Sequence, residues 1–160
     1  MSQSERILGI DPGTLVMGFG VVDRVGSQLR LVDLGSFKFQ ASKDSVQRLG
    51  DILKAVEQLL DQFQPNSLAV EAPFFGKNVQ SMLKLGRAQG VILSAGLRRG
   101  LTVAEYSPAI VKRRISGRGA ASKEQLSGFL HSMFAIPDDP KRLLDATDAL
   151  AVAACHALTL

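Results

Sequence analysis

The sequence predicts an α/β fold in which a mixed five-stranded sheet is flanked by helices. The first forty residues alternate apolar runs with turn residues, which is typical of a three-stranded antiparallel meander. A long amphipathic segment follows, and short apolar runs then alternate with helical segments, which favours parallel pairing in the second half. The 160 residues are 46% hydrophobic, so we expect one domain, residues 1–160, with a substantial core.

Three strands are expected at the start of the chain, at residues 7–11, 17–25 and 29–39. The Asp-Pro-Gly sequence at 11–13 favours a tight turn, because Asp caps the bend, Pro fixes φ and Gly accepts positive φ. The first two strands therefore read as a hairpin. Turn chemistry alone explains Asp11, and a functional role for it requires partners from elsewhere in the chain.

The rest of the chain alternates helices with two short strands. Residues 45–63 carry apolar side chains three and four apart, which predicts an amphipathic helix that Pro65 brings to an end. The short apolar runs at 67–71 and 101–106 are of the strand type. Further helices are expected at residues 78–99, 108–115, 122–134 and 143–158.

Four carboxylates lie where burial should exclude them. Asp11 and Glu71 each end a strand, while Asp145 and Asp148 lie three apart in an otherwise apolar helix and share its inward face. Each has a structural explanation: the helix dipole favours acids near a helix start, and Glu71 could pair with a nearby cation. An unpaired buried carboxylate nevertheless costs several kcal/mol. The group of four therefore favours a shared cation.

Oxygen ligands select a hard divalent ion such as Mg²⁺, which binds few carboxylates together with substrate phosphates. Four carboxylates suit two such ions, about 3.5–4 Å apart, an arrangement that supports in-line attack on a phosphodiester. The sequence thus predicts metal-assisted hydrolysis with Asp11, Glu71, Asp145 and Asp148 as ligands.

Positive charge is concentrated in one segment. Residues 77–123 contain ten Lys or Arg and a single acid, Glu105, which gives +9, whereas the rest of the chain is at −5. This split predicts a surface for a polyanion, although solvated helix faces are the alternative. Within the segment, glycines around Arg118 could leave backbone N–H groups free to bind an anion. A capping box at Ser122 and Gln125 is also expected there.

Several classes are disfavoured. No apolar run approaches the roughly 20 residues of a membrane span, and the start of the chain has no hydrophobic signal core, so we expect a cytoplasmic protein. The single cysteine, Cys155, excludes an intrachain disulfide and a cysteine-rich zinc site.

Five motifs in order, from residue 7 to residue 156, resemble the RuvC family of Holliday-junction resolvases. They are "ILGIDPGT", "AVEAPFFGKN", "LKLGRAQG", "EYSPAIVKRRISGRGAASKEQL" and "DATDALAVAACH". The resemblance implies an RNase H-like fold and a homodimer that makes paired symmetric nicks in four-way DNA junctions during recombination and repair. It also implies dependence on Mg²⁺ or Mn²⁺ and a branch-migration helicase as a partner.

The resemblance implies roles for single residues as well. The four carboxylates fall on the acidic positions of the family, and Lys112 and Lys123 match basic residues near the scissile phosphate and the DNA backbone. Phe74 matches an aromatic near the junction's bases, with Phe75 as the alternative. Ala72-Pro73 departs from the family pattern beside Glu71. The basic segment supplies the other expected contacts, so the predicted DNA-contacting residues are Phe74, Lys77, Asn78, Arg87, Lys112, Arg113, Arg114, Gly117, Arg118, Gly119 and Lys123.

Two other functions are compatible with parts of the sequence. A nucleic-acid-binding scaffold of the same fold would bind junctions without cutting them, and the complete acidic set argues against it. Half of an ATPase is suggested by "IDPGT", but that class needs two such domains around a nucleotide, and 160 residues leave no room for both. Small residues in the helix at 78–99 further predict that it forms part of a dimer contact.

Overall fold

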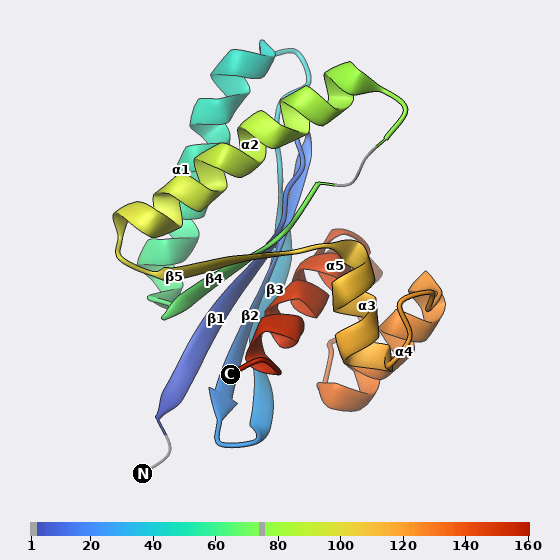
Figure 1. The fold of residues 1–160 in the computed structure, drawn as a ribbon. Coiled ribbons are helices and arrows are strands. Elements are labelled where there is room, and N and C mark those ends of the chain that lie inside the picture. The colour runs from blue at the N-terminus through green and yellow to red at the C-terminus, as the bar shows by residue number, and fades with distance from the viewer. Residues whose placement is uncertain (1–2, 74–75) are drawn as a thin grey trace.

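A computed structural model describes residues 3–73 and 76–160 and confirms the predicted α/β fold (Figure 1). Five strands form one sheet in the order β3-β2-β1-β4-β5. The strands are β1 (Ser4–Asp11), β2 (Val16–Val25), β3 (Gln28–Lys38), β4 (Ser67–Glu71) and β5 (Thr102–Tyr106). The helices are α1 (Ser45–Phe63), α2 (Val79–Arg98), α3 (Pro108–Ser116), α4 (Lys123–Met133) and α5 (Pro140–Ala157).

The sheet is mixed, as predicted. β1, β2 and β3 form an antiparallel meander, and β4 and β5 add to it in parallel. The register between β1 and β4 ends at the pair Ile10 and Val70. The next residue in each strand is an acid, so Asp11 and Glu71 lie side by side at the carboxyl edge of the sheet.

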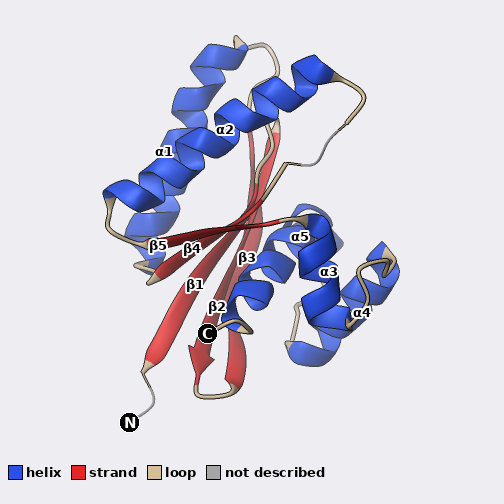
Figure 2. Cartoon of the chain, viewed as in Figure 1, coloured by secondary structure: helices blue, strands red, loops and turns tan. Residues whose placement is uncertain are grey.

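Helices cover both faces of the sheet (Figures 1 and 2). α1 and α2 lie on one face, while α5 packs on the other, with α3 and α4 beyond it. Successive strand side chains point to opposite faces, so Ile7 belongs to the core under α5 and Leu8 to the core under α1 and α2. No helix among the described residues combines the length and apolar character that a membrane span requires.

Helix boundaries follow local chemistry. The prediction for α1 is confirmed at both ends: the Asp44 side chain accepts from Val46 N–H, and Gln64 closes the helix in the left-handed conformation. α5 begins at Pro140, three residues earlier than expected, because proline is tolerated in the first turn. The first turn of α5 contains no acid, so Asp145 gains little from the helix dipole.

A seam of glycines lets α5 pack unusually close to β1 and β2. A Cβ atom on Gly18 would overlap the carbonyl oxygen of Asp145, and one on Gly9 would overlap that of Ala149. A Cβ on Gly20 would lie 2.7 Å from the Cα of Leu150, which is also too close. Only a residue without a side chain fits at such approaches. The seam therefore fixes the part of α5 that carries Asp145 and Asp148 against β1 and β2.

Candidate active site

Three carboxylates from distant parts of the sequence converge at the carboxyl edge of the sheet. Asp11 comes from the end of β1, Glu71 from the end of β4 and Asp148 from α5. One oxygen from each lies within 4.8 Å of the others, and all three residues are half-buried. This geometry matches the predicted metal site for three of its four members.

The electrostatics of these acids are unfavourable without a cation. The pKa of Glu71 is raised to about 9, mainly by burial. The charge of Asp11, a hydrogen bond with Asp11 and the charge of Asp148 add to the shift. Burial is also the main cause that raises the pKa of Asp11. Lys123 opposes both shifts, but only weakly. Without a cation, the hydrogen-bonded pair Asp11 and Glu71 therefore favours a shared proton over two negative charges.

Asp145, the fourth predicted ligand, is half-buried one helical turn before Asp148. It does not belong to the three-carboxylate group. Its negative charge nevertheless raises the pKa of Asp11, which places it beside the site. Its role as a metal ligand stays a prediction.

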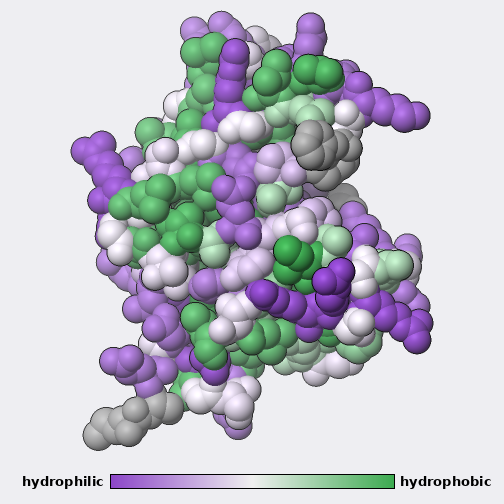
Figure 3. Space-filling model, in the orientation of Figure 1, coloured by the Kyte–Doolittle hydropathy of each residue, from purple (hydrophilic) through white to green (hydrophobic). Residues whose placement is uncertain are grey.

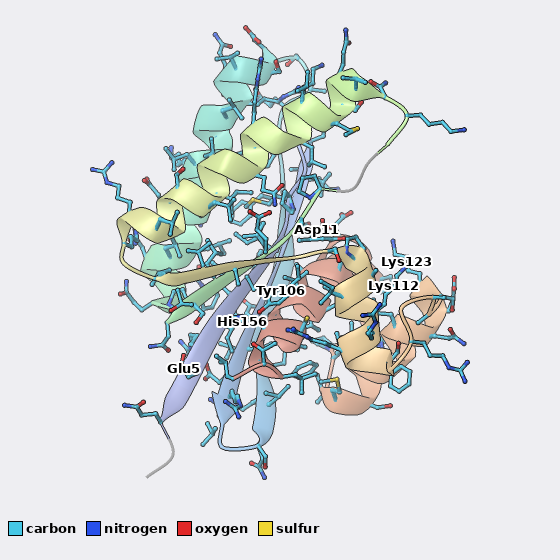
Figure 4. The ribbon with its side chains drawn as sticks, viewed as in Figure 1. Glu5, Asp11, Tyr106, Lys112, Lys123 and His156 are labelled. Carbon is cyan, nitrogen blue, oxygen red and sulfur yellow. The ribbon has the colours of Figure 1, made fainter. Side chains whose placement is uncertain are left out.

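The acids open into a cleft of about 710 Å³ that also contains the two predicted lysines. Glu71 and Asp148 line one part of it, and Lys112 from α3 and Lys123 from α4 line another. Figure 4 shows Asp11 at the edge of the sheet that faces these two helices. Carboxylates and cationic side chains thus line one cavity.

The loop between α3 and α4 uses two of the backbone N–H groups that were expected to be free for an anion. The N–H of Gly117 donates to the Arg113 carbonyl, and that of Arg118 donates to Ser116 Oγ, so neither is free to bind an anion. Gly117 adopts a positive φ and ends α3, whereas Gly119 lines the cleft. The predicted capping box is confirmed: Ser122 and Gln125 bond each other's backbone N–H.

The other predicted DNA contacts are scattered. The Asn78 side chain caps α2, and Arg87 lines a groove between α1 and α2 instead of the cleft. The Arg114 guanidinium lies 5.2 Å from the centre of the Tyr106 ring. Lys77 is exposed, as are Arg113 and Arg118. Phe74 and Phe75 lie outside the described residues.

Two buried polar residues make hydrogen bonds to the ends of β4 and β5, and neither of them was assigned a role from the sequence. Gln89 on α2 donates from Nε2 to the backbone oxygen of Glu71 and to Glu105. Its signal in the sequence is an amide in the inward stripe of α2, between Ala88 and Ile92. His156 on α5 bonds the Tyr106 hydroxyl through Nδ1 at 2.7 Å, which ties the end of β5 to α5.

Comparisons with known proteins agree with this geometry. Residues 7–156 match the family model described as crossover junction endodeoxyribonuclease RuvC. The RuvC of Porphyromonas gingivalis is 48% identical in an alignment of 160 positions that covers 98% of this chain and 84% of that protein. The RuvC of Dehalococcoides mccartyi is 45% identical, with coverage of 94% and 91%. The structure of T. thermophilus RuvC in complex with a Holliday junction substrate superposes with a TM-score of 0.88 at 33% identity, covering 97% of this chain and 94% of that one. The chain therefore belongs to the RuvC family of crossover junction endodeoxyribonucleases.

Proposed function

We propose that the protein resolves four-way DNA junctions by metal-dependent phosphodiester hydrolysis at Asp11, Glu71, Asp145 and Asp148. The observation that carries this proposal is the convergence of three carboxylates within 4.8 Å in a cleft that also holds two lysines. The same group without the lysines would suit a structural cation site. Lysines beside it favour an anionic substrate instead.

The residues present fit a hard divalent cation. All donors are carboxylate oxygens, and the raised pKa of Glu71 reflects repulsion that a bound cation would relieve. Asp11, Glu71 and Asp148 would hold one ion, and Asp145 would complete a second position in the proposed pair. Mg²⁺ is the ion we propose, with Mn²⁺ as a substitute of the same ligand preference. When bound, such ions supply charge neutralisation and activation of water at a phosphate.

The lysines act on the substrate. Lys112 extends into the cleft from α3, and Lys123 stands at the first turn of α4, where its side chain is 70% exposed and free to reach a phosphate. We assign both to binding the scissile phosphate and offsetting charge in the transition state. Exposed cations outside the cleft would add contacts to the DNA backbone that do not depend on sequence. These are Lys77, Arg113 and Arg118.

We also propose that the protein works as a homodimer. Resolution of a junction needs two cuts related by symmetry, and each chain provides one site. A groove of about 770 Å³ runs between α1 and α2, and hydrophobic surface extends over these helices (Figure 3). Leu83 and Leu97 on α2 are 62% and 61% exposed, with small residues between them at Gly90 and Ser94. This face supports a contact with a second copy.

Three further assignments follow from the family and complete the proposal. A branch-migration helicase would deliver the junction, and a chromosomal DNA substrate implies the cytoplasm as the working location. Phe74 stays the proposed aromatic contact to the junction's bases, and Phe75 is its alternative.

The decisive experiment is cleavage of a synthetic four-way junction in Mg²⁺ or in chelator, with linear duplex as the control. We expect cleavage of the junction in Mg²⁺ only. Asp11→Asn, Asp145→Asn and Asp148→Asn should each abolish cleavage and preserve junction binding. Normal cleavage by Asp11→Asn or Asp148→Asn would refute the metal site, and normal cleavage by Asp145→Asn would remove that ligand. Binding by the wild type without cleavage in Mg²⁺ or Mn²⁺ would favour a scaffold.

The dimer has a separate test. Leu83→Glu and Leu97→Glu should shift the sedimentation coefficient from that of a dimer to that of a monomer, because each buries a charge in the proposed contact. Glu57→Gln, at the edge of the groove, serves as a milder control. A wild-type chain that sediments as a monomer with and without junction DNA would contradict the homodimer.

A further inference from the structure

Gln89 is buried in an unusual place for an uncharged polar side chain. Among the residues whose burial the structure describes, four polar or charged side chains are buried, and Gln89, at 3% exposure, is the one on α2. α2 crosses the sheet over β4 and β5 (Figure 1). A buried amide must have its hydrogen bonds satisfied, because an unpaired one costs about 1–3 kcal/mol. Its partners therefore reveal why it is there.

Both observed partners lie at the carboxyl edge of the sheet. Gln89 Nε2 lies 2.8 Å from Glu105 Oε2 and 3.3 Å from the carbonyl oxygen of Glu71. The two hydrogens of one amide group are thus shared between β4 and β5. The bond to Glu105 is short and charge-assisted, so it fixes the orientation of the amide.

The carbonyl of Glu71 is a position where the sheet itself gives less support. Pairing of β1 with β4 ends at Val70, one residue before Glu71. On the other side of the chain, Ala72 N–H donates to the Tyr106 carbonyl at 2.9 Å. The end of β4 is thus held between a side-chain donor from α2 and a backbone acceptor from β5.

We propose that Gln89 is a positioning residue for Glu71, because it fixes the main chain from which the Glu71 carboxylate extends. Rotation of the peptide after Glu71 would displace its side chain from Asp11 and Asp148. The amide holds that peptide by its carbonyl, and Glu105 holds the amide. This inference rests on the proposed role of Glu71 as a metal ligand.

The test separates the support of Glu71 from a general role in packing. Gln89→Glu removes the donor and sets two carboxylates against each other. The double variant Gln89→Glu/Glu105→Gln restores one amide and one carboxylate, and thus the bond between positions 89 and 105, but leaves the Glu71 carbonyl without its donor. Glu105→Gln alone keeps the donor at Gln89. Gln58→Glu, on the exposed face of α1, controls for the added charge.

Two readouts are needed: Mn²⁺ affinity by calorimetry, which does not require turnover, and melting temperature in the metal-free state. We expect Gln89→Glu to bind Mn²⁺ about tenfold more weakly and to melt at a lower temperature. The double variant should recover the melting temperature but not the Mn²⁺ affinity. Glu105→Gln and Gln58→Glu should bind Mn²⁺ as the wild type does.

The possible failures are distinguishable. If the double variant recovers Mn²⁺ affinity together with stability, or if Gln89→Glu binds Mn²⁺ as tightly as the wild type, the positioning role is wrong. If the wild type does not bind Mn²⁺, or if Glu71→Gln binds it equally well, the proposed function itself fails, whatever Gln89 does.

Discussion

The ammonium nitrogen of Lys123 lies 3.9 Å from Oδ2 of Asp148, so a cation from α4 stands directly beside the acidic group. The lysine side chain is 70% exposed, and that of Asp148 is 37% exposed. Such a pair contributes little to stability. Its significance is that the same lysine partly neutralises the acids in the metal-free protein and is free to turn to a phosphate.

Replacement of Lys123 should therefore have opposite effects on metal binding and on cleavage. Lys123→Ala removes a charge that repels cations, so Mn²⁺ should bind about two- to fivefold more tightly, the effect of an exposed pair. Loss of a cation at the phosphate should slow junction cleavage about 100-fold. Calorimetry and single-turnover cleavage measure the two effects. A parallel decrease in both would show that Lys123 supports the fold of the site instead.

The pKa of Glu71 predicts that the metal-free protein loses stability as pH rises. The folded state holds a proton with a pKa of about 9, whereas the unfolded chain releases it near 4.5. Between those values the folded state binds more protons, so its stability falls with increasing pH. From pH 7 to 8.5 we expect a loss of about 2 kcal/mol in urea melts. Glu71→Gln should flatten this dependence, and saturating Mg²⁺ should abolish it because the ion binds the deprotonated form.

The glycine seam predicts a specific sensitivity to added methyl groups. Gly18→Ala sets a Cβ against the carbonyl oxygen of Asp145, so α5 must move. We expect a loss of at least about 2 kcal/mol and of Mn²⁺ binding. Gly50→Ala is the matched control, because its Cβ would meet nothing within 4 Å, and in the interior of α1 it should stabilise by about 0.5–1 kcal/mol. Equal melting temperatures for the two variants would disprove the seam.

The bond between Tyr106 and His156 should support stability without affecting the metal site. Tyr106→Phe removes the hydroxyl and leaves Nδ1 of a histidine that is 4% exposed without this partner. The expected loss is about 1–2 kcal/mol, or a few degrees in melting temperature. The backbone bond from Ala72 to Tyr106 is unchanged, so Mn²⁺ affinity should match that of the wild type. A weaker Mn²⁺ complex would instead connect this pair to the carboxylates.

The elements with strong local signals were predictable from the sequence. The bounds of α1 and β4 agree with the prediction, because Asp44, Pro65 and the apolar spacing specify them locally. The three carboxylates that converge were also predicted, because an acidic residue stands out within a run of apolar residues. Their convergence follows from parallel pairing of β1 and β4, which brings two strand ends to one edge.

What escaped prediction depends on contacts between distant segments. The glycines of β1 and β2 read as ordinary strand residues until α5 is packed on them, and Pro140 reads as a breaker although it begins a helix. Charge alone placed Arg87 and Arg114 among the predicted DNA contacts, and for both this stays a prediction. In the folded chain Arg87 lines the groove between α1 and α2, and Arg114 stacks on Tyr106, because helix rotation decides where each side chain points.

The glycine seam also determines how the enzyme can choose its substrate. Backbone packed on backbone leaves α5 no freedom to slide, so the acidic residues are already in place before any nucleic acid arrives. A preformed catalytic centre cannot tell a branched molecule from a linear one by rearranging itself. The choice between branched and linear DNA must then depend on features outside the carboxylate site. These are the lysines and loops at the mouth of the cleft, and the ease with which the DNA bends to reach the carboxylates.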